Sequence, residues 1–72
     1  MSAASIGMKI KEYLDQNGTK YSFVAEKANI PAPVMSMILS GNRDVKILEY
    51  YRICKVLNVP MEKFVENLEE GE

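Results

Sequence analysis

Hydrophobic residues recur along most of the chain at intervals of three and four positions, the spacing that lines one face of an α-helix. Each of the first four runs ends at an asparagine or a glycine, residues that tolerate the left-handed backbone conformation of a helix stop. No stretch shows the alternation of apolar and polar residues that marks a strand. The pattern therefore predicts an all-α domain of five short helices, over 6–16, 20–28, 33–39, 46–57 and 61–68.

The starts of three helices carry their own signals. Ser5 is expected to cap the first helix and Thr19 the second, because a hydroxyl accepts a hydrogen bond from an unpaired N–H of the first turn. Proline fits a first turn, where its missing N–H has no helical partner, and it disfavours helical dihedrals at the residue before it. The third helix is therefore expected to begin at Pro33, with Ala32 as its cap.

The apolar stripes also predict the core. They are expected to pack together, because links of two to five residues keep consecutive helices adjacent in space. Cys54 is predicted to be a small core residue, and the methionines are predicted to fill the core, with Met37 as the exception. The predicted inward residues are Ile6, Ile10, Tyr13, Leu14, Val24, Ala25, Ala28, Met35, Ile38, Leu39, Ile47, Tyr50, Cys54, Leu57, Met61, Phe64, Val65 and Leu68.

The chain of 72 residues has room for one domain, 1–72, whose core is expected over 6–68 and whose acidic end, 69–72, is expected to fray. No run approaches the roughly 18 apolar residues of a membrane helix, and the start lacks a cleavable leader, so we expect a cytoplasmic protein. The sequence contains no histidine and one cysteine. We therefore expect no metal site, no cofactor and no enzymatic activity.

Charge is distributed unevenly along the chain. The net charge is −1. Residues 20–46 carry four basic side chains against two acidic ones, whereas residues 47–72 carry three against six. A weakly basic middle beside an acidic end is compatible with nucleic acid on one face, although the field that it produces is modest.

Two stretches of the sequence carry a family resemblance, GTKYSFVAEKANIPAPVMSMILSGNR and, following it, ILEYYRICKVLNVPMEKF. They resemble the helix-turn-helix domains of phage repressors and Cro proteins. In that family the helix before the turn contains an apolar residue followed by alanine, here Val24-Ala25, and a turn residue four positions later, here Asn29. Gly41 matches the glycine that ends the next helix. The register runs without gaps over 6–68.

The resemblance implies both a fold and a function. The fold is a compact five-helix domain, and the helix over 33–39 enters the major groove of double-stranded DNA, as in a repressor or Cro-like transcriptional regulator from a prokaryote or phage. The residues that the resemblance places toward the bases are Ala32, Pro33, Val34 and Met37. Those that it places along the phosphates are Lys20, Tyr21, Asn42, Arg43 and Lys46.

The recognition helix departs from the family pattern. Relatives commonly carry Gln, Arg, Lys, Ser or Thr on its outer face, whereas the apolar residues here offer contacts with thymine methyl groups. The hydroxyl of Ser36 is expected to turn toward Ala25 and the core. Leu14 and Leu39 stand where many relatives hold an Arg–Glu pair, and we expect these two leucines to be buried against each other.

Two functions fit these observations. The first is a DNA-binding regulator that acts as a homodimer on half-sites about one helical turn apart, with the dimer formed through Phe64, Val65 and Leu68. The second is a protein-interaction module, as in an antirepressor or an antitoxin, which binds its partner through the apolar face of the third helix and binds DNA weakly or not at all. The basic residues favour DNA, and the apolar helix and the net negative charge favour a protein partner.

Overall fold

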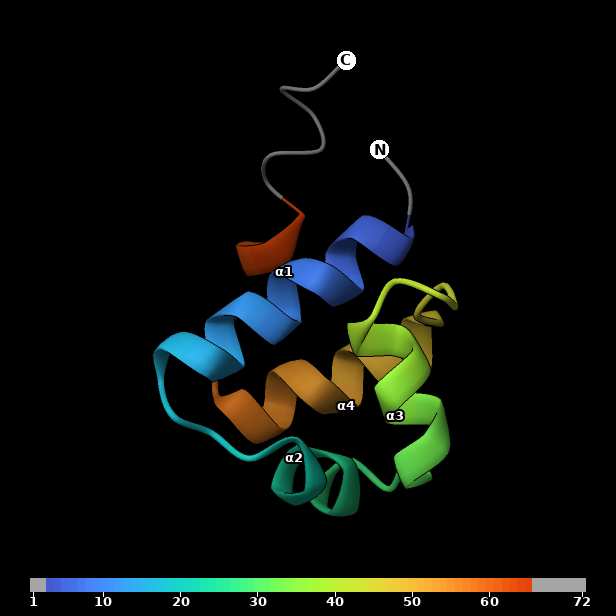
Figure 1. The fold of residues 1–72 in the computed structure, drawn as a ribbon. Coiled ribbons are helices and arrows are strands. Elements are labelled where there is room, and N and C mark those ends of the chain that lie inside the picture. Colours follow the sequence, from blue (N-terminus) through green and yellow to red (C-terminus); the bar gives the residue numbers. More distant parts are fainter. Residues whose placement is uncertain (1–2, 66–72) are drawn as a thin grey trace.

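The computed structural model describes residues 3–65, which fold into four α-helices and one turn of 3₁₀-helix (Figure 1). α2 (Tyr21–Lys27) and α3 (Ala32–Leu39) lie together at one end of the molecule, and η1 (Met61–Phe64) lies against α1 (Ala3–Gln16) at the other end. The described part contains no strand, which confirms the all-α prediction. None of these helices is long and apolar enough to cross a bilayer. The elements are α1 (Ala3–Gln16), α2 (Tyr21–Lys27), α3 (Ala32–Leu39), α4 (Ile47–Leu57) and η1 (Met61–Phe64).

The first two helices begin elsewhere than predicted. α1 already begins at Ala3, so Ser5 lies inside the helix rather than at its cap. Alanine has the highest helix propensity, which favours this extension. Thr19 does not occupy the cap position of α2. Its N–H donates to the carbonyl of Leu14 at 2.9 Å and so closes the end of α1. The cap position of α2 is held by Lys20, without a side-chain hydrogen bond.

The third and fourth helices are each displaced by one residue at their start. α3 begins at Ala32, which was predicted to be its cap, and Pro31 holds the cap position with extended dihedrals. Pro33 then falls in the first turn, where no helical partner for its nitrogen is needed. α4 begins at Ile47, with Lys46 as its cap residue rather than as its first helical residue.

The predicted fifth helix is a 3₁₀ turn over Met61–Phe64 within the described residues. Phe64 is buried edge-on against Tyr13 and Tyr50, with ring centroids 5.6 and 6.4 Å apart. The predicted dimer surface of Phe64, Val65 and Leu68 is therefore wrong for Phe64, which is part of the core. Residues 66–72, which include Leu68 and the acidic end 69–72, lie outside the described residues.

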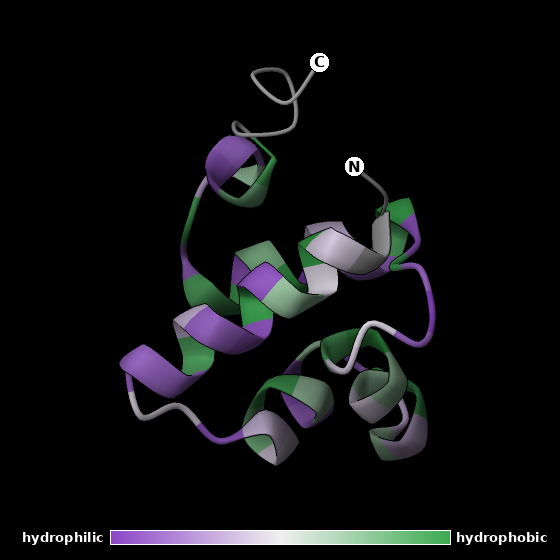
Figure 2. Ribbon diagram, turned by 45° about the horizontal axis from the view of Figure 1, so that its top comes forward, coloured by the Kyte–Doolittle hydropathy of each residue, from purple (hydrophilic) through white to green (hydrophobic). Residues whose placement is uncertain are grey.

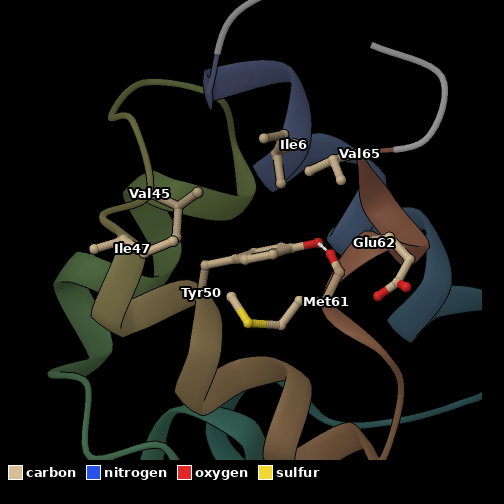
Figure 3. A pocket seen from close by; sticks show the side chains of 7 residues that line it. All are labelled: Ile6, Val45, Ile47, Tyr50, Met61, Glu62 and Val65. Carbon is tan, nitrogen blue, oxygen red and sulfur yellow. Dashed lines mark hydrogen bonds between the residues drawn. The ribbon is translucent and has the colours of Figure 1, made fainter. Parts of the chain in front are cut away.

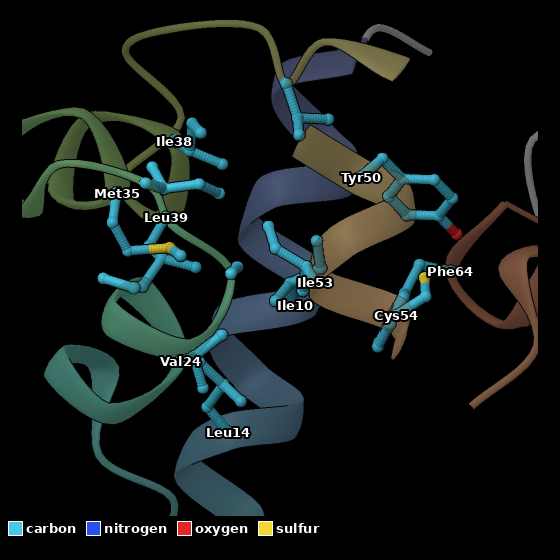
Figure 4. Close-up of a cluster of buried hydrophobic side chains, with 14 residues drawn as sticks. Ile10, Leu14, Val24, Met35, Ile38, Leu39, Tyr50, Ile53, Cys54 and Phe64 are labelled. Atoms are coloured by element: carbon cyan, nitrogen blue, oxygen red, sulfur yellow. The ribbon is translucent and has the colours of Figure 1, made fainter. Parts of the chain in front are cut away.

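A single cluster of 14 buried apolar side chains draws on all five elements (Figure 4). Leu14 and Leu39 both belong to it, as their places in the helical stripes predict. Cys54 is a core residue, which confirms its prediction. Ile47 is not, because it lies at the start of α4 with 71% of its surface exposed. Met8 is exposed as well, so Met37 is not the sole methionine outside the core.

Gly7 lies where α1 meets the end of α3, and it is buried there. A Cβ atom at this position would overlap the carbonyl oxygen of Ile38 and would lie 3.0 Å from its carbonyl carbon and 3.1 Å from Cγ2. Two of these three atoms are backbone, so rotation of a side chain cannot relieve the overlap. The close contact between α1 and α3 therefore requires glycine at residue 7.

We expect Gly7→Ala to destabilise the domain by about 1–3 kcal/mol, the usual cost of overpacking. The direction of this change in stability is informative, because helix propensity alone predicts the opposite: in a free helix alanine is favoured over glycine by about 1 kcal/mol. Urea unfolding followed by circular dichroism measures the difference. Met8→Ala, at the next and exposed position, is the control and should be nearly neutral. A more stable Gly7→Ala variant would show that α1 does not lie against Ile38.

Candidate nucleic-acid interface

α2 and α3 form a tight helix-turn-helix unit. Asn29 occupies the turn with φ of 58°, and the N–H of Ile30 donates to the carbonyl of Ala25 at 2.9 Å. Asparagine adopts this left-handed conformation more readily than most residues, as the sequence pattern requires. Val24 and Ala25 are buried beneath the turn, and Ile30 is buried with them. These contacts fix the angle between the two helices.

The outward side of α3 is largely apolar. Its ribbon in Figure 2 carries almost no strongly hydrophilic colour, unlike that of α1. Of the residues predicted to face the bases, Ala32 and Pro33 are exposed and Met37 is 45% exposed. Val34 is half-buried and packs against the core. The structure thus brings three of the four candidates to the surface of one helix and holds the fourth at its edge.

The side chain of Ser36 lies elsewhere than predicted. It was predicted to turn toward the core, but its side chain is exposed. It does lie near Ala25, because both residues line a small groove between α2 and α3. No hydrogen bond within residues 3–65 engages its hydroxyl, and Ser36 is therefore a polar group on α3 that is available to a ligand.

The predicted phosphate contacts at the start of α2 are not equivalent. Lys20 is exposed. The hydroxyl of Tyr21 donates to Asp15 at 2.5 Å, and Lys11 binds the other oxygen of the same carboxylate at 3.2 Å. Hydrogen bonds from Tyr21 and Lys11 lower the pKa of Asp15, and the bond to Asp15 raises the pKa of Tyr21. A phosphate must compete with Asp15 for the Tyr21 proton.

The loop after α3 is held by a carboxylate that the sequence analysis missed. Gly41 turns the chain with φ of 82°. The guanidinium of Arg43 donates two parallel hydrogen bonds to Glu49, at 2.9 and 3.1 Å. The same carboxylate accepts the backbone N–H of Lys46 at 2.9 Å. The signal was present, because Glu49 stands three residues after the cap position of α4, where such a carboxylate closes a helix start.

Arg43 and Lys46 consequently differ in what they offer to a ligand. The side chains of Arg43 and Glu49 are only 24% and 16% exposed, so their ion pair is largely shielded from solvent. The pair raises the pKa of Arg43 and lowers that of Glu49. Lys46 is exposed, and the carboxylate binds its backbone rather than its side chain. Asn42 is exposed nearby and donates through its amide to Ser40 at 3.0 Å.

The family model described as helix-turn-helix matches residues 10–64 of the chain. The matched segment contains α2, the turn, α3 and the loop held by Glu49. No curated protein and no solved structure matches the chain.

The Glu49 carboxylate should make folding sensitive to acid. Its pKa is lowered in the folded protein, so the stabilisation is present above its ordinary value of 4.5 and is lost as the pH falls through the folded value. We expect Glu49→Gln to reduce stability by about 1 kcal/mol at neutral pH, since hydrogen bonds to charged groups contribute that much or more. The difference from the wild type should vanish once Glu49 is protonated.

Thermal melting from neutral to acidic pH measures this effect. Glu26→Gln is the matched control, because Glu26 is exposed and makes no side-chain hydrogen bond or ion pair within residues 3–65, so the substitution should be nearly neutral. The same difference in melting temperature between the wild type and Glu49→Gln at every pH would contradict the proposed stabilisation by the Glu49 carboxylate.

Proposed function

The chain belongs to the helix-turn-helix family of the phage-repressor and Cro-like type, a family of DNA-binding regulators, and from this premise we propose that it is a sequence-specific transcriptional regulator that inserts α3 into the major groove of double-stranded DNA. The observation that carries the proposal is the α2–turn–α3 unit, whose angle is fixed from beneath and whose outer side is exposed. An α-helix fits the major groove, which is about 12 Å wide.

Affinity in this proposal comes chiefly from the phosphates. Lys20 stands exposed immediately before α2, and Lys46 stands exposed after the loop that follows α3. Arg43 supports the loop through Glu49, so a phosphate must share this guanidinium with that carboxylate or compete with it. Asn42 and Tyr21 add neutral donors. Such contacts position the protein on the duplex and carry no sequence information themselves.

Sequence discrimination would rest on methyl groups. Ala32, Pro33 and Met37 have no donor or acceptor that could read a base edge, whereas thymine presents a C5 methyl in the major groove. Ser36 adds one hydroxyl, which can bond to any base. Without a bidentate reader, we expect discrimination between sites to be weak and to follow the positions of thymines.

The alternative is a protein-interaction module, and one observation favours it. Met37 on α3 and Phe23 on α2 are both exposed, by 45% and 48%, in a chain whose net charge is −1. In that case, an apolar partner would cover the face that we assign to DNA, as in an antirepressor or an antitoxin. A duplex that does not bind at low salt would support this alternative.

A salt titration of binding to random duplex tests the DNA proposal. Two copies that each use Lys20 and Lys46 release the counterions of about four phosphates, which gives a log–log slope of roughly −4. Participation of Arg43 would steepen the slope to roughly −5. We expect Lys46→Ala to weaken binding to all sequences about equally. Lys55→Ala, an exposed lysine in the later turns of α4, is the matched control and should leave the slope unchanged. Absence of binding at low salt overturns the proposal.

Replacing thymine by deoxyuridine tests methyl readout without altering base pairing. In a site selected from random DNA, we expect each contacted methyl to contribute about 0.8 kcal/mol, so its removal should weaken binding about fourfold. Deoxyuridine in the flanks serves as the control. Met37→Gln should reduce the difference in affinity between the thymine duplex and the deoxyuridine duplex. Equal binding to both duplexes would show that α3 does not read methyl groups.

A further inference from the structure

The ion pair between Arg43 and Glu49 leaves one edge of the guanidinium unused. A guanidinium has five N–H donors, and two of its edges can each donate a pair of parallel hydrogen bonds. Glu49 occupies the edge formed by Nη1 and Nη2, and the backbone carbonyl of Asp44 accepts a further bond from Nη1 at 3.3 Å. The other edge consists of Nε–H and the second N–H of Nη2, and within residues 3–65 no hydrogen bond engages either group.

This second edge can be reached from outside the protein. Arg43 is half-buried, and every buried side-chain nitrogen or oxygen within residues 3–65 has a hydrogen-bond partner. Nε has no such partner there, so this nitrogen is in contact with solvent. A ligand can therefore bind the second edge while Glu49 keeps both of its hydrogen bonds to Arg43.

The carboxylate that holds Arg43 is itself fixed in place. Glu49 accepts the backbone N–H of Lys46 at 2.9 Å. Its neighbour Tyr50 is buried, and the hydroxyl of Tyr50 donates to the backbone carbonyl of Met61 (Figure 3). A free arginine side chain loses many rotamers when it binds a ligand, which opposes binding. Folding has already imposed much of that loss on Arg43.

The chemistry of the second edge suits an oxyanion. Two parallel N–H groups match two oxygens of one phosphate. The ion pair has no net charge, so its attraction for DNA at long range is weak. Its contribution must come from the geometry of the contact itself, which depends on how precisely Glu49 holds the guanidinium.

We propose that Glu49 is a positioning residue for DNA binding, which stays paired with Arg43 in the complex and orients the second edge of its guanidinium toward a backbone phosphate. The inference rests on the proposed function. It predicts an effect opposite to that of charge. Removal of a negative charge should strengthen binding to a polyanion, whereas removal of the positioning residue should weaken it.

Binding to a random-sequence duplex at low salt tests this difference. We expect Glu49→Gln to weaken binding by about three- to tenfold, the effect of leaving one long side chain to be ordered by the ligand. Glu26→Gln removes the same charge from an exposed residue of α2 and should leave the affinity unchanged or slightly higher. Thermal melting first establishes that each variant is folded at the temperature of the assay.

A second pair of variants separates positioning from a general support of the loop. In an Arg43→Ala background, Glu49→Gln should no longer weaken binding, because no guanidinium remains to be oriented. The loss of an unpaired negative charge should instead strengthen binding slightly. A carboxylate that only stabilises the loop would weaken binding in both backgrounds.

Nuclear magnetic resonance of the ¹⁵N-labelled chain observes the second edge directly. The chain contains two arginines, Arg43 and Arg52, and therefore two Nε–H signals. Addition of duplex should shift the signal of Arg43 and slow its exchange with water, because a phosphate oxygen then accepts this hydrogen bond. Arg52 is exposed on α4, outside the proposed contacts, and provides the internal control. Both changes at Arg43 should be smaller in Glu49→Gln.

Three results would overturn the inference and leave the DNA proposal standing. The first is a Glu49→Gln variant that binds duplex as tightly as the wild type or more tightly, which would show that the carboxylate competes with phosphate. The second is an equal loss of affinity in the wild-type and Arg43→Ala backgrounds. The third is an Arg43 signal that does not respond to duplex. A wild-type chain that binds no duplex at low salt would instead refute the DNA proposal and this inference with it.

Discussion

The contact between Gly7 and the backbone of Ile38 is the constraint on which the rest of the structure depends. It draws α1 onto the end of α3 so closely that no side chain fits between them. With this end fixed, Ile38 and Leu39 are buried in the core and the opposite side of α3 is left outside. The turn at Asn29 then holds α2 against the other end of α3. The exposed side of α3 is therefore a consequence of how its inner side is anchored.

Polar contacts contribute to this architecture at the helix ends. The carboxylate of Glu49 binds Arg43 and the N–H of Lys46, and so ties the loop after α3 to the first turn of α4. Asp15 does the same for the link between α1 and α2 by accepting the Tyr21 hydroxyl. In both places an acidic residue engages a residue that the family resemblance assigns to phosphate. Local folding and ligand binding therefore use the same side chains.

The sequence predicts those features that depend on periodicity or on one conformational preference. The stripes predict that Leu14, Leu39 and Cys54 are buried, and Asn29 predicts the turn. The sequence does not predict features that depend on which residues become neighbours in the folded structure. The helical period alone places Ile47 on an inward stripe, whereas the fold leaves this residue 71% exposed. Glycine at residue 7 is unremarkable in sequence, because its importance comes from a carbonyl 31 residues away.

The burial of Cys54 has a consequence for how the molecule can be observed. It is the one cysteine of the chain, it lies in the core, and burial raises the pKa of its thiol. A raised pKa and an inaccessible sulfur both suppress attack by alkylating reagents, which react with the thiolate. Modification must then wait until the packing around α4 opens. The rate at which Cys54 is alkylated therefore reports how often the core opens, and no probe has to be introduced to measure it.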